Sequence, residues 1–188
     1  DLHSAFLILE LIKNIIKEKK VSFEVAKDIA SSKTVFTTHT PVPAGHDAFS
    51  ENMLRTYISH YADRLKISWE QLLGLGKINV ADPNEKFSMS FLAANLAQEM
   101  NGVSWLHGEV SKEIFKGMWP GYMAEELHIS YVTNGVHYPT WAAPEWKKIE
   151  ESLFGEDFKN HHYDKKCFEQ IYTVPDAVVY EVLPNFLS

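Results

Sequence analysis

Residues 35–47 read Val-Phe-Thr-Thr-His-Thr-Pro-Val-Pro-Ala-Gly-His-Asp. The first four of them favour a short, partly buried β-strand, because β-branched and aromatic side chains suit a pleated surface. The two prolines that follow fix their own φ angles and push the residues before them into extended conformations, and Gly45 allows a tight turn. The pattern predicts a stiff loop that holds His39 and Thr40 at the end of a strand, where open α/β sheets place their ligands.

The composition is that of a globular chain with a core. Of its 188 residues, 45% are hydrophobic and 13% are aromatic, and the formal net charge is −7. The basic residues form no stripe, so we expect no nucleic-acid partner. The single cysteine, Cys167, excludes an intrachain disulfide and suits the cytoplasm, where we expect the protein to reside. No signal peptide is recognisable, and the longest apolar run, Ala5–Leu9, is far short of the roughly 20 residues of a membrane helix.

Hydrophobic periodicity predicts an α/β chain that is predominantly helical, with two or three short strands. Two strands cannot form a stable sheet alone, so we expect either further strands from sequence outside this chain or an incomplete folding unit. The chain starts at Asp1, almost inside a helical pattern, which indicates an internal piece of a longer protein. Helices are predicted over 5–18, 22–30, 49–65, 68–74 or 68–76, 87–100, 103–114, 143–153 and 176–182, and strands over 35–38 and 129–132.

Two further motifs follow the first in the chain. Residues 101–109 read Asn-Gly-Val-Ser-Trp-Leu-His-Gly-Glu, and residues 131–137 read Tyr-Val-Thr-Asn-Gly-Val-His. Together with residues 35–47, and in the same order, they strongly resemble the short-form α-glucan phosphorylases of bacteria and archaea. Residues 1–6, Asp-Leu-His-Ser-Ala-Phe, fit a fourth family segment more loosely. The resemblance runs from Asp1 to about Trp141 and identifies the chain as an internal fragment of such an enzyme.

The resemblance implies a fold and an activity for the whole protein. The family fold is a two-domain, Rossmann-like glycosyltransferase of the GT-B type, with its site between the domains. Residues 1–135 would be the end of the N-terminal domain, and residues 136–188 a helical crossover into the start of an absent C-terminal domain. The whole enzyme would transfer a glucosyl unit from α-1,4-glucan or maltooligosaccharide to inorganic phosphate, giving α-D-glucose 1-phosphate with retention. The sequence leaves the oligomeric state open, a homo-oligomer included.

The family cofactor is pyridoxal 5′-phosphate, whose phosphate group serves as proton donor and acceptor. The cofactor lysine of the family stands in a Gly-Thr-Gly-Asn-Met-Lys-like run, and no lysine of this chain has that context. We therefore expect no cofactor-binding residue in this fragment, and no activity from the fragment alone.

The resemblance also implies which residues form the site. His39 would be the catalytic residue, because the matching backbone carbonyl faces the reacting carbon of the sugar, where positive charge develops. The matching asparagine binds a sugar hydroxyl, which suits an amide that both donates and accepts. The implied substrate-binding residues are Asp1, His3, Thr40, Val103 and Asn134.

Each of these residues also has a purely structural interpretation. His39 could be a loop histidine bonded to neighbouring backbone, and Asn134 could only form a turn with Gly135. Val103 could be an ordinary core residue. Four residues further on, His107 would share its helical face, and we expect it to be a packed histidine.

Two other functions remain open from the residues themselves. A non-catalytic carbohydrate-binding module could use the five tryptophans and eight tyrosines for stacking, although the tryptophans do not line one helical face. A metal-dependent phosphohydrolase could use the adjacent His46 and Asp47, with His60 and Asp63 as further ligands. Asp47 also fits a simple helix N-cap, and we expect no metal site.

Overall fold

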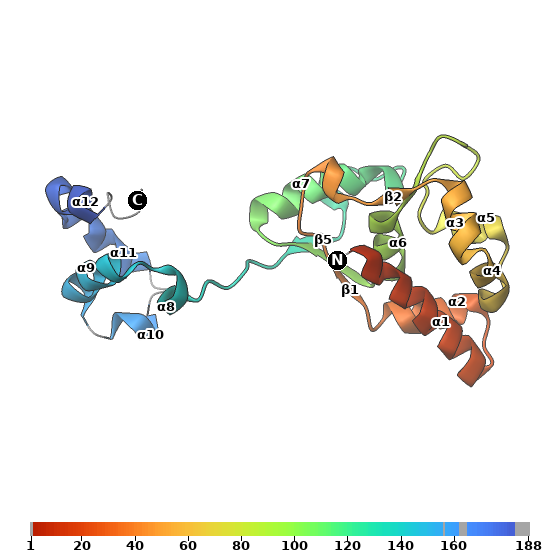
Figure 1. Cartoon of the computed structure of the whole chain (residues 1–188), viewed down its shortest axis with the longest axis horizontal. Helices are drawn as coiled ribbons and strands as arrows, with labels where there is room; N and C mark the ends of the chain where they lie inside the picture. Colours follow the sequence, from red (N-terminus) through yellow and green to blue (C-terminus); the bar gives the residue numbers. More distant parts are fainter. Residues whose placement is uncertain (1, 156, 162–164, 183–188) are drawn as a thin grey trace. The chain divides into compact units, whose positions relative to one another are not determined.

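The computed structural model describes residues 2–155, 157–161 and 165–182. The chain divides into two compact units, Asp1–Asn134 and Gly135–Ser188 (Figure 1). The described residues confirm a mixed α/β chain that is mostly helical. The helices of the first unit are η1 (Leu2–Ala5), α1 (Phe6–Lys19), α2 (Phe23–Ser31), η2 (Pro43–Gly45), α3 (Glu51–Ile58), α4 (His60–Leu65), α5 (Trp69–Gly74), α6 (Met89–Leu96), α7 (Trp105–Phe115), η3 (Lys116–Met118) and η4 (Ala124–Glu126).

The first unit contains a small parallel sheet. Its strands are β1 (Val35–Thr37), β4 (Glu99–Gly102) and β5 (Ile129–Tyr131), in the order β1-β4-β5. Both ladders are parallel, and Asn101 is the register partner of Thr37 on one side and of Ser130 on the other. A separate antiparallel pair joins β2 (Ala48–Phe49) to β3 (Phe87–Ser88). The sheet thus has β4 between the two strands that the sequence predicts.

The helix predicted over 87–100 is wrong at both ends. Only Met89–Leu96 is helical, and Glu99–Gly102 forms the central strand β4. Asparagine and glycine are poor strand formers, so local propensity gives no sign of this strand. Its pairing with β1 and β5 on both sides, and the burial of residues 100–102, outweigh that propensity.

The helix predicted over 49–65 is also divided. Ala48–Phe49 pairs with β3, and Ser59 separates α3 from α4. The N-cap of α3 is Ser50, whose hydroxyl accepts from the backbone N–H of Met53. The prediction that Asp47 caps this helix is therefore wrong.

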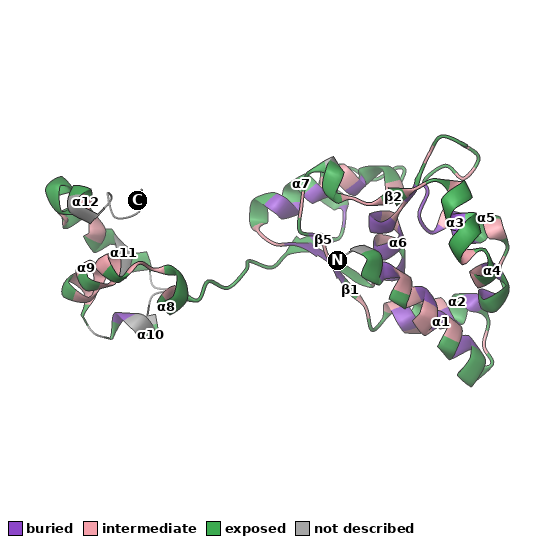
Figure 2. Cartoon of the chain, in the orientation of Figure 1, coloured by how far each residue is buried: buried purple, intermediate pink, exposed green. Residues whose placement is uncertain are grey.

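The core of the first unit lies between α1, α2, α4 and α6. Helix α1 buries Leu9 and Ile12 and packs beside α2 and α4, while α6 buries Leu92 and Leu96 (Figure 2). Leu7 of α1 faces the solvent instead, and 69% of the surface of this residue is exposed. The broad apolar face predicted for this helix is thus covered only in part by the described residues.

Two predicted helix starts are confirmed by their caps. The Ser22 hydroxyl accepts from the Val25 N–H at the start of α2. Ser68 and Gln71 form a reciprocal capping box at the start of α5. Each cap supplies an acceptor for an N–H that has no partner within its helix.

A charged cluster joins α3 to α5. The Glu51 carboxylate accepts from the Arg55 guanidinium at 2.8 Å and from the Trp69 indole N–H at 2.9 Å. The Arg55 guanidinium also lies 4.6 Å from the centre of the Trp69 ring. The Arg55 hydrogen bond, followed by that of Trp69, lowers the pKa of Glu51.

The lowered pKa of Glu51 predicts a pH-dependent stability. Ionised Glu51 stabilises the folded chain above its unfolded pKa of about 4.3, and this contribution is lost as the pH falls through the lower folded value. We expect Glu51→Gln in the whole protein to lower the thermal midpoint by about 2 °C at pH 7 and to change it little at pH 3. Differential scanning calorimetry at the two pH values measures this, and an equal loss at both would contradict the charge-based account.

The second unit is a set of short helices. The helices predicted over 143–153 and 176–182 are confirmed. Among the described side chains of residues 135–180, only Phe158 is buried, where its ring lies edge-on to Tyr138. Partial burial of Tyr138, and then its hydrogen bond to Glu150, raise the pKa of the Tyr138 phenol. The helices are α8 (Tyr138–Trp141), α9 (Pro144–Phe154), α10 (Phe158–His161), α11 (Lys165–Glu169), η5 (Gln170–Thr173) and α12 (Asp176–Val182).

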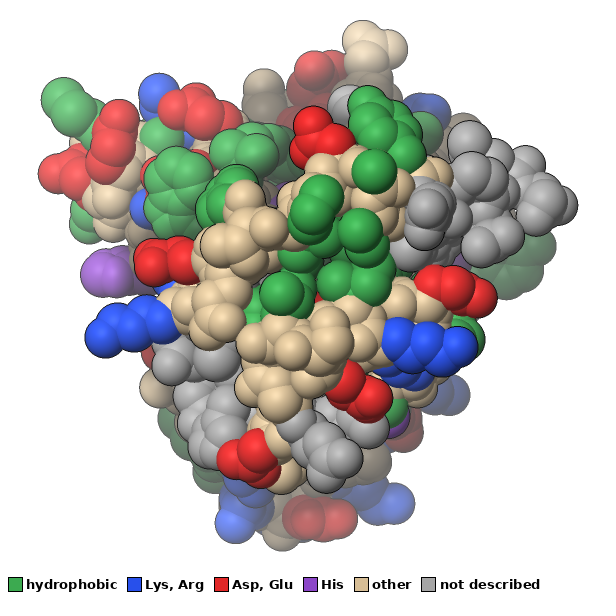
Figure 3. Space-filling view, turned by 90° about the vertical axis from the view of Figure 1, so that its left-hand side faces the viewer, with side chains coloured by type: hydrophobic (Ala, Val, Ile, Leu, Met, Phe, Trp, Pro, Cys, Tyr) green, Lys and Arg blue, Asp and Glu red, His purple; other side chains and the backbone are tan. Residues whose placement is uncertain are grey.

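Hydrophobic side chains gather near the centre of the face shown in Figure 3. In the second unit, Trp141 and Tyr172 are among the exposed aromatic side chains. The described side chains of this unit therefore contribute little stability through burial. Within the described part of the chain, no helix has both the length and the apolar character to cross a lipid bilayer.

Candidate active-site wall

The three parallel strands end at one edge of the sheet. His39 follows β1, Val103 follows β4, and Asn134 lies three residues beyond β5. Because parallel strands share a direction, their carboxyl ends lie at the same edge. Neighbouring strands are about 4.8 Å apart, so the ends of β1 and β5 are separated by roughly 10 Å. The topology thus brings three sequence-predicted site segments to one edge.

Asn101 joins the strand ends to one another. Its carbonyl oxygen accepts from the Thr38 N–H at 3.0 Å, and its Oδ1 accepts from the Thr37 hydroxyl at 3.1 Å. Its Nδ2 donates to the Gly102 carbonyl at 3.0 Å, and that carbonyl accepts from the Val132 N–H at 2.9 Å. The asparagine side chain is buried and holds β1 and β4 in register. Sequence reasoning missed this role because it depends on the unpredicted strand.

The loop after β1 is held by internal hydrogen bonds. The Thr40 hydroxyl accepts from the Val42 N–H at 3.1 Å, and the Gly45 N–H donates to the Val42 carbonyl at 2.9 Å. His46 Nε2 lies 3.0 Å from the Thr40 carbonyl oxygen. The His39 side chain is exposed at the start of this loop, two residues after β1. The local geometry agrees with the stiff loop that the two prolines predict.

Gly45 lies against Thr40 with no space for a side chain. A Cβ atom at this glycine would lie 2.4 Å from Thr40 Cγ2. We expect Gly45→Ala to move the loop and lower kcat/KM of the whole enzyme about tenfold, with a small change in thermal midpoint. Ala44→Ser, at an exposed neighbouring position, is the matched control. Unchanged kinetics of Gly45→Ala would show that the loop conformation is irrelevant to the activity.

His3 lies beside the far end of the same loop. Its Nδ1 is 3.6 Å from the Asp47 carboxylate, and its ring centre is 6.0 Å from that of Phe49. The backbone carbonyl of Asp47 accepts from the Met89 N–H at 2.9 Å and so ties this end of the loop to α6. Asp1, the other predicted residue of the N-terminal segment, lies outside the described residues.

Val103 and His107 do not share a helical face, so that prediction is wrong. Helix α7 begins only at Trp105, with Ser104 as its N-cap. Val103 lies in the preceding turn, and its N–H donates to His107 Nδ1 at 3.2 Å. His107 is 8% exposed, and its Nε2 makes no hydrogen bond within the described part of the chain. The histidine therefore folds back onto the turn that carries Val103.

The described residues give no support to a metal site. They contain no group of three His, Cys, Asp or Glu side chains that could hold a metal ion. His46, the first ligand that such a site would need, has both ring nitrogens within hydrogen-bond distance of the chain itself. The interpretation as a metal-dependent phosphohydrolase therefore has no structural basis in these residues.

Comparison with known proteins identifies the family. The family model for carbohydrate phosphorylase matches residues 1–177. The chain is 40% identical over 161 residues to glycogen phosphorylase of Mycobacterium tuberculosis (strain CDC 1551 / Oshkosh). The matched region covers 82% of this chain and 18% of the length of that relative. The chain belongs to the carbohydrate phosphorylase family. The resemblance found in the sequence motifs is confirmed.

Further members of the phosphorylase family match nearly the whole chain. It is 31% identical to glycogen phosphorylase of Aquifex aeolicus and 30% identical to maltodextrin phosphorylase of Thermococcus litoralis. Each match covers 95% of this chain. The matched region makes up 25% of the length of the Aquifex protein and 21% of the length of the Thermococcus protein. The chain thus spans about a fifth to a quarter of the length of these phosphorylases.

An open cavity of about 640 Å³ runs along the outer side of β1 in this phosphorylase segment. Its lining extends from Lys33, at the amino end of β1, to Thr40 beyond the carboxyl end, and includes Leu7 and Leu11 of α1. The cavity therefore follows β1, an edge strand of the described sheet, and continues to the predicted site loop, where His39 and His46 line it.

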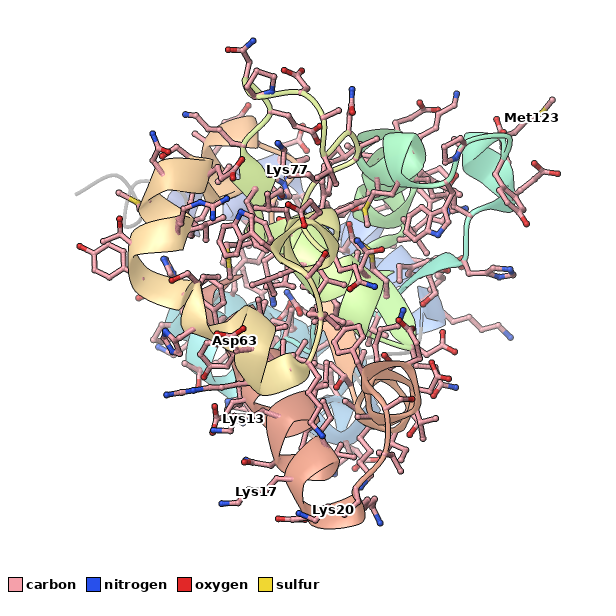
Figure 4. The ribbon with its side chains drawn as sticks, turned by 90° about the vertical axis from the view of Figure 1, so that its right-hand side faces the viewer. Lys13, Lys17, Lys20, Asp63, Lys77 and Met123 are labelled. Atoms are coloured by element: carbon pink, nitrogen blue, oxygen red, sulfur yellow. The ribbon has the colours of Figure 1, made fainter. Side chains whose placement is uncertain are left out.

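Four lysines of the first unit, labelled in Figure 4, do not fit a pyridoxal phosphate site at the sheet edge. Lys77 is buried, but its Nζ donates to the Asp82 carbonyl at 2.7 Å within its own loop. Lys13 and Lys17 lie on α1 and Lys20 is its C-cap residue (Figure 4), and Lys13 is paired with Glu10. None of these lysines belongs to the strand ends where the sugar-site motifs meet.

Proposed function

We propose that this chain is a segment of an α-glucan phosphorylase and forms the glucosyl-binding wall of its active site. The observation that carries the proposal is the meeting of three family motifs at the carboxyl edge of one parallel sheet. The whole enzyme would transfer a terminal glucosyl unit from an α-1,4-glucan to inorganic phosphate, with retention of configuration. A cytoplasmic location and the oligomeric state stay predictions.

Within this wall, the residues have distinct proposed roles. The His39 carbonyl faces the reacting carbon of the sugar, where a fixed dipole stabilises the positive charge of the transition state. Thr40 and Val103 contact the glucosyl unit, and Asn134 binds a sugar hydroxyl. His3 lies at the end of the loop, beside Asp47, and borders the same site.

We assign the first unit to the end of a Rossmann-like N-terminal domain of the GT-B type. A parallel sheet with helices between its strands supports this assignment. So does the cavity along β1, because an apolar groove beside an unpaired strand edge suits a further strand of the same domain. The second unit would continue into the C-terminal domain.

Pyridoxal phosphate would be held by sequence outside this chain. Its phosphate group would supply proton transfer next to the sugar, while the residues described here bind and orient the glucosyl unit. Lys13, Lys17, Lys20 and Lys77 support this division of roles, because none of these four residues belongs to the strand ends of the first unit.

An assay of glucose 1-phosphate formation tests the proposal. The whole protein, incubated with maltoheptaose and inorganic phosphate, should release α-D-glucose 1-phosphate, and removal of pyridoxal phosphate should abolish the reaction. Residues 1–188 alone should neither bind the cofactor nor release product. A whole protein that binds maltoheptaose without phosphorolysis would favour a carbohydrate-binding module and contradict the proposal.

A further inference from the structure

His46 is held at both nitrogens of its imidazole ring. Nε2 lies 3.0 Å from the Thr40 carbonyl oxygen, and Nδ1 lies 2.7 Å from the Ser90 hydroxyl. A carbonyl oxygen can only accept, so Nε2 carries the hydrogen of this bond. In the neutral ring, Nδ1 then accepts from Ser90. The two contacts fix both the tautomer and the orientation of the ring.

The partners that hold this imidazole belong to the core. Ser90 lies on α6, 44 residues further along the chain, and is 1% exposed. The ring also lies nearly edge-on to the fully buried Phe115 of α7, with 6.1 Å between ring centres. Phe115 in turn makes an edge contact with Phe36 of β1. His46 therefore connects the surface loop to α6, α7 and the strand from which the loop leaves.

The hydrogen bond to the Thr40 carbonyl matters because of the residue that follows Thr40. The peptide bond that follows it leads into Pro41, which has no N–H. The carbonyl is thus the one hydrogen-bonding group by which the orientation of this peptide unit can be fixed. Because the preceding unit carries the His39 carbonyl, a rotation at Thr40 would also redirect that group.

We propose that His46 is a positioning residue for the glucosyl site. Anchored by Ser90 and Phe115, it binds the Thr40 carbonyl and thereby holds the backbone of residues 39–40 in the orientation that the reacting sugar requires. The inference rests on the proposed phosphorylase function. It assigns His46 no contact with substrate; its effect passes through Thr40.

Two substitutions of His46 in the whole protein separate its two hydrogen bonds. The amide nitrogen of glutamine lies about as far from the backbone as Nε2, so His46→Gln can still donate to Thr40. The shorter asparagine reaches only the level of Nδ1, so His46→Asn can bond Ser90 but not Thr40. We expect His46→Asn to lower kcat at least tenfold with KM for phosphate within twofold of wild type, and His46→Gln to keep kcat within threefold.

Ser90→Ala tests the anchor. We expect a threefold to tenfold loss of kcat, and little further loss when Ser90→Ala is combined with His46→Asn, because both act through one hydrogen-bonded unit. Losses that multiply would overturn the proposed coupling. Equal losses of kcat in His46→Gln and His46→Asn, or wild-type kcat in His46→Asn, would overturn the positioning role.

A structural readout keeps this inference distinct from the phosphorylase proposal. Crystal structures of the whole His46→Asn and His46→Gln proteins should show the Thr40 carbonyl displaced in the first and retained in the second. If the wild-type protein makes no glucose 1-phosphate, the proposed function fails, whatever these structures show. If the protein is active but the carbonyl stays in place in both variants, the positioning role fails alone.

Discussion

Gly102→Ala should destabilise the protein strongly, because an added methyl group would collide with backbone atoms of α7. A Cβ at Gly102 would lie 2.7 Å from the Gly108 backbone nitrogen and 3.0 Å from the Gly108 Cα. These are backbone atoms of α7 and cannot rotate away, so β4 and the helix would have to separate. We expect a loss of about 3 kcal/mol, the upper part of the usual range for overpacking.

The close packing at Gly102 extends to the next strand. A Cβ at Gly108 would lie 3.2 Å from the Ser130 carbonyl oxygen of β5. The two glycines thus allow α7 to lie directly on β4 and β5, next to the turn that carries Val103. A helix displaced by Gly102→Ala would therefore also move a proposed sugar contact, and activity should fall with stability.

Thermal unfolding of the whole protein, followed by calorimetry, measures the effect of Gly102→Ala. The matched control is Gly74→Ala in α5, where the nearest atom would be a Val80 methyl at 3.5 Å, an ordinary contact. Alanine is the better helix former, so this control should be neutral or slightly stabilising. An unchanged thermal midpoint for Gly102→Ala would contradict the packing described here.

Asn134→Ala should lower the activity strongly while it leaves the stability of the protein almost unchanged. Asn134 is exposed at the end of β5, so its truncation removes no core contact. If its amide binds a sugar hydroxyl in the active site, truncation to alanine leaves that hydroxyl without a partner. We expect kcat/KM for maltoheptaose to fall about 100-fold, which corresponds to roughly 2.7 kcal/mol.

The same substitution elsewhere provides the control for Asn134→Ala. Asn84→Ala changes an exposed asparagine of the loop before β3 and should leave kcat/KM within twofold of wild type. The thermal midpoints of both variants should stay within about 1 °C of wild type. Wild-type kinetics for Asn134→Ala would remove this residue from the site, and a large loss of stability would assign it a structural role.

Features that depend on neighbouring residues could be predicted from the sequence. The caps at Ser22 and Ser68 and the helices around 143–153 and 176–182 are of this kind, because each is specified within one or two turns of chain. The strand at Val35–Thr37 was also recognisable, since its side chains and its two prolines act locally.

Features that depend on distant residues could not be predicted. Glu99–Gly102 becomes a strand only through its pairing with β1 and β5, against its own propensity. Without that strand, Val103 was assigned to a helix and the buried role of Asn101 was missed. Likewise, the adjacent His46 and Asp47 resemble a pair of metal ligands, and only the structure shows that the His46 ring lies within hydrogen-bond distance of Ser90 and Thr40.

A crystal structure of the whole protein with bound glucose tests the central claim most directly. The account predicts glucose at the carboxyl edge of β1, β4 and β5, with a hydroxyl about 3 Å from the Asn134 amide and its C1 atom facing the His39 carbonyl. Val103 should contact the sugar ring. Glucose bound at another place, with this edge left empty, would contradict the account.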